Sequence, residues 1–556
     1  IGNPPWERVK VQDREFFSLT DPATAGAVRA ADRKKRIAEM PTANPELHAA
    51  YLTAREHAQK LLDYAHLPVE QGGRYPLTSN GDVNLYTLFA ELARSLVAPH
   101  GLVGLLVPSG IATHDTTKRF FADLMDSKRL VSLYDFENRN KVFEDVDGRF
   151  KFTALIFGGE NRKTDQADFV FFAHGVEETT EANKQRHIPL TTADMALLNP
   201  NTKTCPIFRT RRDANLTKAI YKRIPILIDE NRKKGGNPWG IKFFTMFHQT
   251  NDSEHFHDAK VWKKQGYKLD GNVYIKGQKR ALPLYEAKMV QAFDHRAASV
   301  TIDEENWVRQ GQKDETSLVQ HQNPEFGALP RWWVDEALVN KTLESQPGNK
   351  PWFVGFKEIT SPTNERTMIA SFVPRVAATN KFVLMLTDAA PRRQACLLAN
   401  LNSSVFDYAT RQKLGSTTLN FFIVEQLPTL PPDTYADRCP WSKKETLEHW
   451  ISGRVLKLSC TAEDMIPLAQ ACDFEGSRGD GVHIWKDTER VEIRAELDAA
   501  YFHLYGIERE NVEYMLSTFT DTGLPPQDEP GSQHFLWSPG STGAMILEAF
   551  DRLQPP

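Results

Sequence analysis

The chain has 556 residues, of which 40% are hydrophobic and 25% charged, and its formal net charge is −4. This composition is that of a globular protein of roughly two to four domains, and no stretch approaches the roughly 18 apolar residues of a membrane span. We see no signal peptide. The five cysteines are odd in number and widely spread, without a Cys-x-x-Cys pair. The sequence therefore predicts a cytoplasmic protein without a zinc ribbon, and we expect no metal site.

The first motif along the chain is Asn3-Pro4-Pro5-Trp6, which suits chemistry on an amino group attached to a planar ring. The Asn3 amide oxygen and the Pro4 carbonyl oxygen are acceptors for two N–H bonds of a target amine. The two prolines stiffen the loop and remove two backbone donors, and Trp6 offers a flat face for a base turned out of a duplex. Only two residues precede the motif, so we expect the strand that delivers this loop to precede the sequence.

The next segments alternate between helix and strand. Polar helical patterns at Ala25–Ala38 and Pro45–Ala65 indicate a helical insertion at about residues 13–80. Leu85–Val97 is an amphipathic helix ended by a Pro-His-Gly turn. Leu102–Pro108 is a continuous apolar run of strand length, as expected for a strand that is buried on both faces.

A helix at Asp115–Ser127 and strands at Leu130–Phe136 and Phe150–Phe157 complete this part. The order helix, strand, helix, strand, strand is that of the second half of a doubly wound, Rossmann-like α/β sheet. We therefore expect residues 1–175 to form a partial catalytic domain of α/β class.

After about residue 165 the alternation is lost. Irregular segments rich in aromatic residues, Pro and Asn indicate a separate, mixed α+β recognition domain at 185–435, with short helices at Leu284–Phe293 and Ala395–Ala409. Residues 436–556 return to helical patterns, notably Val491–Tyr505 and Glu508–Phe519. The last part, from Asp521 to Gly543, is acidic and rich in Pro, Gly and Ser, and is expected to be poorly ordered.

Charge is concentrated between Lys203 and Lys242, where eleven Lys and Arg face only three acidic residues. Such a stretch is a candidate phosphate-contacting face, and the alternative is a solvated helix surface. The candidate contacts here are Arg211, Arg212, Lys233 and Lys234.

Several motifs occur in an order that resembles the second half of a gamma-class, adenine-specific DNA methyltransferase. The likeness is to the large single-chain methylases of type IIG restriction-modification and phage-defence systems, and it covers roughly residues 1–515. The motifs that carry it are Asn3–Trp6, Asn84–Phe89, Val107–Ser109, Val142-Phe143, Asn199–Phe208, Pro283–Met289, Thr363–Ala370, Asn400–Asp407, Leu419–Phe422 and Arg494–Ala499.

The resemblance implies roles for individual residues. Asn3 and Pro4 would accept hydrogen bonds from the target adenine amine, and Trp6 would stack on the flipped base. Phe143 matches a position that packs against the base from the side, with a core aromatic as the alternative. Phe89 matches a position that lines the S-adenosylmethionine pocket, although a core position is the alternative for it too. Pro5 belongs to the same catalytic motif.

The resemblance also implies double-stranded DNA as the partner. Within residues 185–435, Arg366 in Asn364-Glu-Arg-Thr367, and Arg411 and Lys413 beside Gly415, are further candidate DNA contacts, each with a structural role as the alternative.

One feature of the family is missing upstream of the catalytic motif: the glycine-rich loop that binds S-adenosylmethionine and the acidic residue for its ribose. We therefore expect the chain to be the C-terminal portion of a longer enzyme, or one piece of a split enzyme that needs a partner subunit. Other functions stay open: a DNA-recognition module without catalysis of its own, or a methyltransferase that acts on RNA or on protein glutamine.

Overall fold

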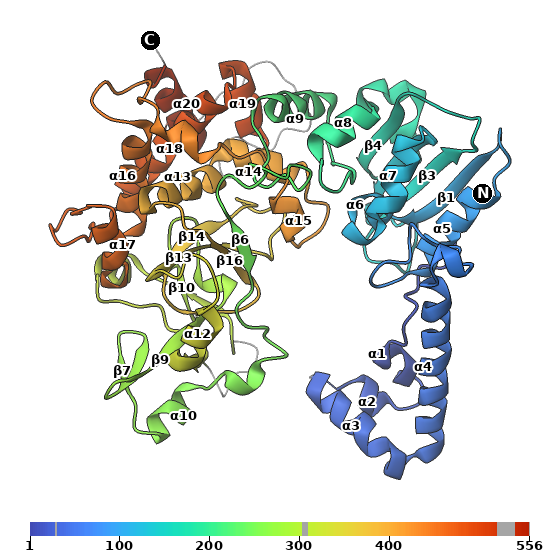
Figure 1. Ribbon diagram of the computed structural model, residues 1–556, viewed down its shortest axis with the longest axis horizontal. Coiled ribbons are helices and arrows are strands. Elements are labelled where there is room, and N and C mark those ends of the chain that lie inside the picture. The colour runs from blue at the N-terminus through green and yellow to red at the C-terminus, as the bar shows by residue number, and fades with distance from the viewer. Residues whose placement is uncertain (28–29, 149, 303–309, 520–539, 555–556) are drawn as a thin grey trace. The chain divides into compact units, whose positions relative to one another are not determined.

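The computed structural model describes residues 1–27, 30–148, 150–302, 310–519 and 540–554 of this mixed α/β chain (Figure 1). It divides into two compact units, Ile1–Asn215 and Leu216–Pro556. The predicted three-part layout stays a prediction. The predicted boundary near 175–185 falls inside unit 1, because the strands on either side of it, β4 (Ala167–Ala173) and β5 (Ile188–Leu190), pair with each other. The predicted boundary near 435 falls inside unit 2, because the helices on either side of it, α13 (Pro391–Asn402) and α16 (Leu447–Ser459), pack together. Within the described residues, no helix is both long and apolar enough to cross a membrane.

Unit 1 is built around a five-stranded sheet with the strand order β1-β3-β2-β4-β5. Strands β1, β2 and β4 run in one direction, and β3 and β5 run in the opposite direction. The bounds of the strands are β1 Leu102–Pro108, β2 Leu130–Glu137, β3 Lys151–Gly158, β4 Ala167–Ala173 and β5 Ile188–Leu190.

Gly2 extends this sheet beyond β1. It forms a parallel bridge with Leu105, in which the Gly2 N–H donates to the Gly104 carbonyl at 2.9 Å and the Leu106 N–H donates to the Gly2 carbonyl at 3.0 Å. Because this single bridge is all that pairs with the outer edge of β1 in the described chain, β1 is only partly covered. Its side chains at Val103 and Val107 are buried and the rest are not, so the prediction of burial on both faces is wrong here.

The predicted alternation of elements in unit 1 is confirmed. Helix α5 packs against β1, and in α7 the ring of Phe120 meets that of Phe157 on β3 edge-on at 6.3 Å (Figure 1). The helices of this unit are α1 Asp13–Phe17, α2 Pro22–Ala25, α3 Ala30–Ala43, α4 Pro45–Ala65, α5 Leu85–Leu96, α6 Gly110–Thr113, α7 Lys118–Asp126 and α8 Thr192–Leu198.

The segment between the Asn3–Trp6 motif and α5 is helical, and its two ends lie side by side. The Val9 N–H donates to the Val83 carbonyl, and the Leu85 N–H donates to the Glu7 carbonyl, both at 2.9 Å. These two bonds tie the chain that leaves Trp6 to the first turn of α5. Helices α1 to α4 thus form an excursion whose ends are held together.

Unit 2 contains two larger sheets and a two-stranded ribbon. One sheet has the order β14-β13-β16-β6, and the other has the order β12-β9-β8-β7 with β15 parallel to β9; β10 pairs with β11. The strands are β6 Lys242–Phe244, β7 Lys268–Asp270, β8 Val273–Lys276, β9 Lys279–Tyr285, β10 Ala298–Val300, β11 Lys313–Glu315, β12 Trp333–Asp335, β13 Trp352–Lys357, β14 Ala370–Pro374, β15 Ala377–Ala378 and β16 Phe382–Leu386.

The helices of unit 2 include a buried group in which α13 packs on α16, and α18 packs on α14 and α20. α9 crosses the division between the units. The helices are α9 Arg211–Arg223, α10 Ala259–Lys264, α11 Leu318–Gln322, α12 Glu336–Leu343, α13 Pro391–Asn402, α14 Ser404–Arg411, α15 Phe421–Val424, α16 Leu447–Ser459, α17 Ile466–Ala471, α18 Asp487–Tyr505, α19 Arg509–Ser517 and α20 Thr542–Arg552.

Three local predictions in unit 2 differ from the structure. The helix predicted at Leu284–Phe293 is wrong, because its first two residues belong to the buried strand β9 and a short 3-10 turn follows. The helix predicted at Ala395–Ala409 is two helices, because Ser403 adopts an extended conformation between α13 and α14. Of the tail, residues 520–539 lie outside the described chain, whereas Ser541 caps α20.

Candidate functional site

The Asn3–Trp6 motif lies at the carboxyl end of the sheet of unit 1. Gly2 runs parallel to β1, so residues 3–6 leave the sheet at the edge where β1, β2 and β4 also end. In open α/β sheets ligands bind at this edge. The structure therefore brings the motif to the expected side of the sheet, together with the loops that follow Pro108 and Glu137.

Within the motif, Asn3 is exposed and Pro4 is buried. The Asn3 side chain makes no hydrogen bond with any described residue, so its amide oxygen is open to an external donor. Because Pro4 and Pro5 carry no N–H, the loop presents carbonyl oxygens and no donors at these two positions.

Trp6 is held in place by both its polar atom and its rings. Its Nε1–H donates to the Leu106 carbonyl at 3.3 Å. The indole lies nearly parallel to the ring of Phe150, with centroids 5.8 Å apart, and meets the ring of Phe143 at a steep angle at 5.6 Å. Such aromatic contacts are worth roughly 0.5–1.5 kcal/mol each beyond burial. Trp6 thus presents a fixed, half-buried flat surface.

Phe143 owes its position to a buried asparagine that follows β2. The Asn138 Nδ2 donates to the carbonyls of Phe143 at 2.8 Å and Val146 at 2.9 Å, and its Oδ1 accepts from the Phe143 N–H at 2.9 Å. The ring of Phe143 also contacts Phe152 of the core at 5.0 Å. It is therefore half-buried, packed on the core with one side and on Trp6 with the other.

A hollow of about 550 Å³ begins at Trp6 and extends along the chain that follows it. Its lining is mixed, with two cationic and two acidic side chains among aromatic and apolar ones: Trp6, Glu7, Arg8, Lys10, Val11, Gln12, Glu15 and Phe16. A space of this size lies within the range of small-molecule sites. Trp6 therefore borders a volume of the size of a small-molecule site.

A second polar pair lies at the ends of β1 and β2. The Ser109 hydroxyl donates to the carboxylate of Asp135, which is buried. Burial raises the pKa of Asp135 to about 6, against the opposing effects of Lys151 and of the Ser109 hydrogen bond.

Phe89 is not a core residue. Its side chain on α5 is 46% exposed, while its neighbours Leu88 and Ala90 are buried. The first turn of α5 is tied to Glu7, immediately after the catalytic motif. Phe89 therefore offers an exposed aromatic ring on an element that is joined to the motif.

The sequence did not single out Asn138, Phe150 or Asp135. Each of them lies at or near one end of a predicted strand, where a polar or aromatic residue interrupts an apolar run. This position is the sequence feature that could have marked them as candidate site residues. Their contacts come from pairing between β1, β2 and β3, which a single sequence does not show.

Within unit 1, several cations of the basic stretch contact other residues of the same unit. The Arg211 Nε donates to the His187 carbonyl, and Arg212 is half-buried. Lys203 pairs with Asp126 at 2.7 Å, and the Arg209 guanidinium stacks on Phe172 at 4.3 Å.

Among the four candidates of this stretch, Lys233 and Lys234 are the exposed pair that forms no ion pair with a described residue. They remain candidates for phosphate contact.

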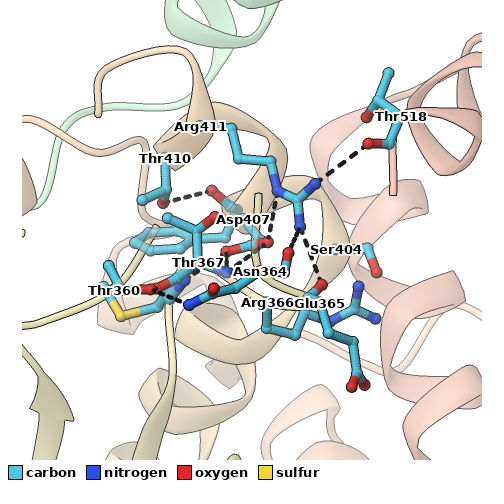
Figure 2. Close-up of polar contacts among 12 residues, drawn as sticks. Thr360, Asn364, Glu365, Arg366, Thr367, Ser404, Asp407, Thr410, Arg411 and Thr518 are labelled. Atoms are coloured by element: carbon cyan, nitrogen blue, oxygen red, sulfur yellow. Dashed lines mark hydrogen bonds and ion pairs between the residues drawn. The ribbon is translucent and has the colours of Figure 1, made fainter. Parts of the chain in front are cut away.

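Arg411 is a structural residue. Its Nε donates to the buried Asp407 at 3.2 Å, and one terminal nitrogen donates to the carbonyls of Asn364 and Glu365 at 2.9 and 3.0 Å (Figure 2). The other donates to the Thr518 carbonyl at 3.2 Å. With its side chain 9% exposed, the prediction of a DNA contact is corrected, because its donors are used to fix the 364–365 loop.

Lys413 is also internal. Its Nζ donates to the Gln426 carbonyl at 2.5 Å and lies 4.5 Å from the centroid of the Tyr221 ring. Burial holds the pKa of Lys413 well below its usual range. The prediction of a DNA contact is corrected here as well, because solvent and phosphate do not reach the amine.

Arg366 has an intermediate position. Its guanidinium pairs with the buried Asp498 at 3.8 Å and lies 5.0 Å from the centroid of the Phe519 ring. It is not a surface cation, but it lines a hollow of unit 2.

The Asn138 network predicts a measurable effect on the Phe143 loop. Asn138→Ala removes three hydrogen bonds, and each buried group left unpaired costs about 1–3 kcal/mol. We expect amide hydrogen exchange of Phe143 to accelerate at least about tenfold, as read by mass spectrometry. Asn140→Ala, at an exposed position in the same loop, is the control and is expected to change nothing. Unaltered exchange at 139–146 in Asn138→Ala would contradict this account.

The raised pKa of Asp135 predicts a pH dependence of stability. Because the folded pKa of about 6 exceeds the ordinary aspartate pKa of 3.8, the contribution of Asp135 to stability is fully present below pH 4 and is lost as the pH rises through about 6. The size is about 3 kcal/mol. We measure the free energy of unfolding by urea denaturation of the chain between pH 4 and 7. We expect Asp135→Asn to remove the decrease in this free energy with rising pH, while Asp145→Asn keeps it. Parallel pH profiles of wild type and Asp135→Asn would contradict the assignment.

No protein-family model matches the chain, and no curated protein matches it. Among solved structures it is similar to the type IIL restriction-modification enzyme MmeI in complex with DNA (TM-score 0.35, 12% identity), to the type IIG restriction endonuclease BpuSI (0.26, 12%) and to DrdV in a DNA complex (0.35, 8%). The alignments cover 86%, 82% and 74% of this chain and 53%, 52% and 42% of those chains. The chain thus spans about half the length of the solved proteins it matches. At these TM-scores the likeness establishes neither a shared fold nor a shared function.

Proposed function

We propose that the chain is the C-terminal portion of a DNA adenine-N6 methyltransferase of a restriction-modification or phage-defence system. The observation that carries the proposal is the parallel bridge of Gly2 to β1, which sets Asn3–Trp6 at the carboxyl edge of the sheet beside Phe143. In this proposal the sheet of unit 1 is the second half of a Rossmann-like methyltransferase sheet.

The proposed chemistry needs acceptors for an amine. The Asn3 Oδ1 and the Pro4 carbonyl oxygen accept the two N–H bonds of the adenine amino group, which holds the nitrogen lone pair away from the ring. S-adenosylmethionine, when bound, supplies a methyl group that its positively charged sulfur already activates. The residues of this chain orient the amine, and the rigid proline pair keeps the acceptors in place.

The adenine itself must leave the duplex to reach these acceptors. Trp6 supplies the stacking face, Phe143 closes one side of the base, and the hollow beside Trp6 gives the nucleotide room. Phe150, which stacks on Trp6 here and is 43% exposed, stands where it can border the same base.

The fit to the cofactor is partial. The exposed ring of Phe89 on α5 suits one face of an adenosine, and α5 is tied to the catalytic loop through Glu7. We propose that the remaining contacts with the cofactor come from residues outside this sequence or from a partner subunit.

Duplex DNA is the proposed substrate, with base identity read by unit 2. Lys233 and Lys234 are exposed and support contact with phosphates. The alternatives are a recognition module without catalysis, and methylation of RNA or protein glutamine. Calorimetry with S-adenosylmethionine, alone and with duplex DNA, separates them: DNA binding without cofactor binding favours the recognition module for the isolated chain.

The catalytic proposal is tested in the intact protein that contains this chain. Asn3→Ala removes one acceptor of the target amine, and loss of one such interaction costs roughly 100-fold or more in rate. We expect the rate of N6-methyladenine formation in duplex DNA to fall by that amount while DNA affinity changes less than about threefold.

Asn80→Ala, at an exposed position of the same unit, is the matched control and should methylate at the wild-type rate. Methylation by Asn3→Ala within tenfold of wild type would remove the assignment of Asn3.

A further inference from the structure

Unit 2 contains a hollow of about 490 Å³ that lies apart from the catalytic motif in the sequence. The end of strand β13, the loops that contain residues 291–292 and 359–369, and helix α18 contribute to it. Three of its nine lining residues are cationic and one is acidic: Gln291, Ala292, Lys357, Ile359, Asn364, Glu365, Arg366, Ile369 and Arg494.

Lys357 is the distinctive residue of this hollow. It is the last residue of β13 and is half-buried, and its side-chain amine makes no hydrogen bond or ion pair with any described residue. Burial and the nearby charge of Lys313 lower the pKa of Lys357 to about 8. A desolvated cation without a counter-ion is costly, and an anion in the hollow would relieve that cost.

The other cations are held rigidly around the same space. Arg366 is fixed by Asp498 at 3.8 Å, and Arg494 projects from α18, the helix that also carries Asp498. Because both come from packed elements, the hollow presents fixed positive charge rather than flexible surface side chains.

The loop that carries Asn364, Glu365 and Arg366 is also fixed. Buried Asp407 accepts from the Thr367 and Met368 N–H groups, and Arg411 donates to the carbonyls of residues 364 and 365 (Figure 2). Figure 2 shows these bonds converging on the loop from the α14 side. The loop that carries Arg366 is thus in place before any ligand arrives, which lowers the entropy cost of binding at this residue.

We propose that this hollow is a binding site for a phosphate group, with Lys357 as its principal contact and Arg366 and Arg494 beside it. Arg guanidinium groups and Lys ammonium groups are the usual phosphate ligands, and the Asn364 and Gln291 amides are further polar groups of the lining. Exposed Ile359 at the rim gives an apolar surface for the group that carries the phosphate. The phosphate comes either from the backbone of DNA, in which case the inference rests on the proposed function, or from a free nucleotide.

The test measures acetylation of Lys357 by mass spectrometry at pH 8 in the full chain. It is run without ligand, with inorganic pyrophosphate, and with a duplex DNA at low salt. We expect pyrophosphate to slow labelling of Lys357 at least fivefold, while labelling of the exposed Lys341 changes less than twofold. Slowing by the duplex as well assigns the phosphate to DNA, and slowing by pyrophosphate alone assigns it to a nucleotide. Unchanged labelling of Lys357 with both ligands overturns the site.

Fluorescence anisotropy of the same duplex keeps the two proposals apart. If wild type binds the duplex while Lys357 stays fully reactive with both ligands, the phosphate site fails and DNA binding stands. If the duplex does not bind while pyrophosphate protects Lys357, DNA binding fails and the phosphate site stands.

If the phosphate belongs to DNA, Lys357→Met should reduce the slope of log affinity against log salt by about one. Lys341→Met, a matched change at an exposed position, should alter the slope by much less. Equal slopes for wild type and Lys357→Met would overturn the DNA source.

Discussion

The candidate site of unit 1 depends on one backbone interaction, the parallel pairing of Gly2 with β1. Two hydrogen bonds, to and from the backbone between Gly104 and Leu106, set both the direction and the register of the chain that enters Asn3–Trp6. An antiparallel pairing would send the same four residues to the opposite edge of the sheet. Because the segment around Gly2 runs parallel to β1, it leaves the sheet at the same edge as β1. The acceptor oxygens of the motif therefore lie on the side of the sheet where the loops after β1 and β2 begin, and these loops and the motif form the candidate site.

A second layer of contacts makes the site rigid. Both the nitrogen and the oxygen of the Asn138 side-chain amide form hydrogen bonds with the backbone of the loop that carries Phe143. The Trp6 indole donates a hydrogen bond to the backbone of β1. In unit 2, Asp407 and Arg411 play a similar part for the 364–368 loop. In both places a buried polar side chain bonds only to other residues of the protein and so fixes the backbone of a loop. The candidate binding residues that lie next to these loops remain accessible to a ligand.

Much of the fold of unit 1 was predictable, since its helices and strands have clear periodicity and firm ends. The sheet order was not, because β3 inserts between β1 and β2 and only pairing decides this. In unit 2, Leu284-Tyr285 was mistaken for helix, since a short apolar run fits either state. The prediction for Arg411 and Lys413 is wrong because basic residues beside a short polar segment with a glycine look exposed in sequence, whereas tertiary packing buries both.

The central claim is that duplex DNA meets unit 1 at the loops around Trp6 and Phe143. Hydrogen–deuterium exchange of the intact protein, with and without a methylatable duplex, tests it directly. The account predicts slower exchange at the amides of Asn3 and Trp6 and across 138–148 when DNA is bound. Bound DNA that protects only unit 2 and leaves those amides unchanged would contradict it.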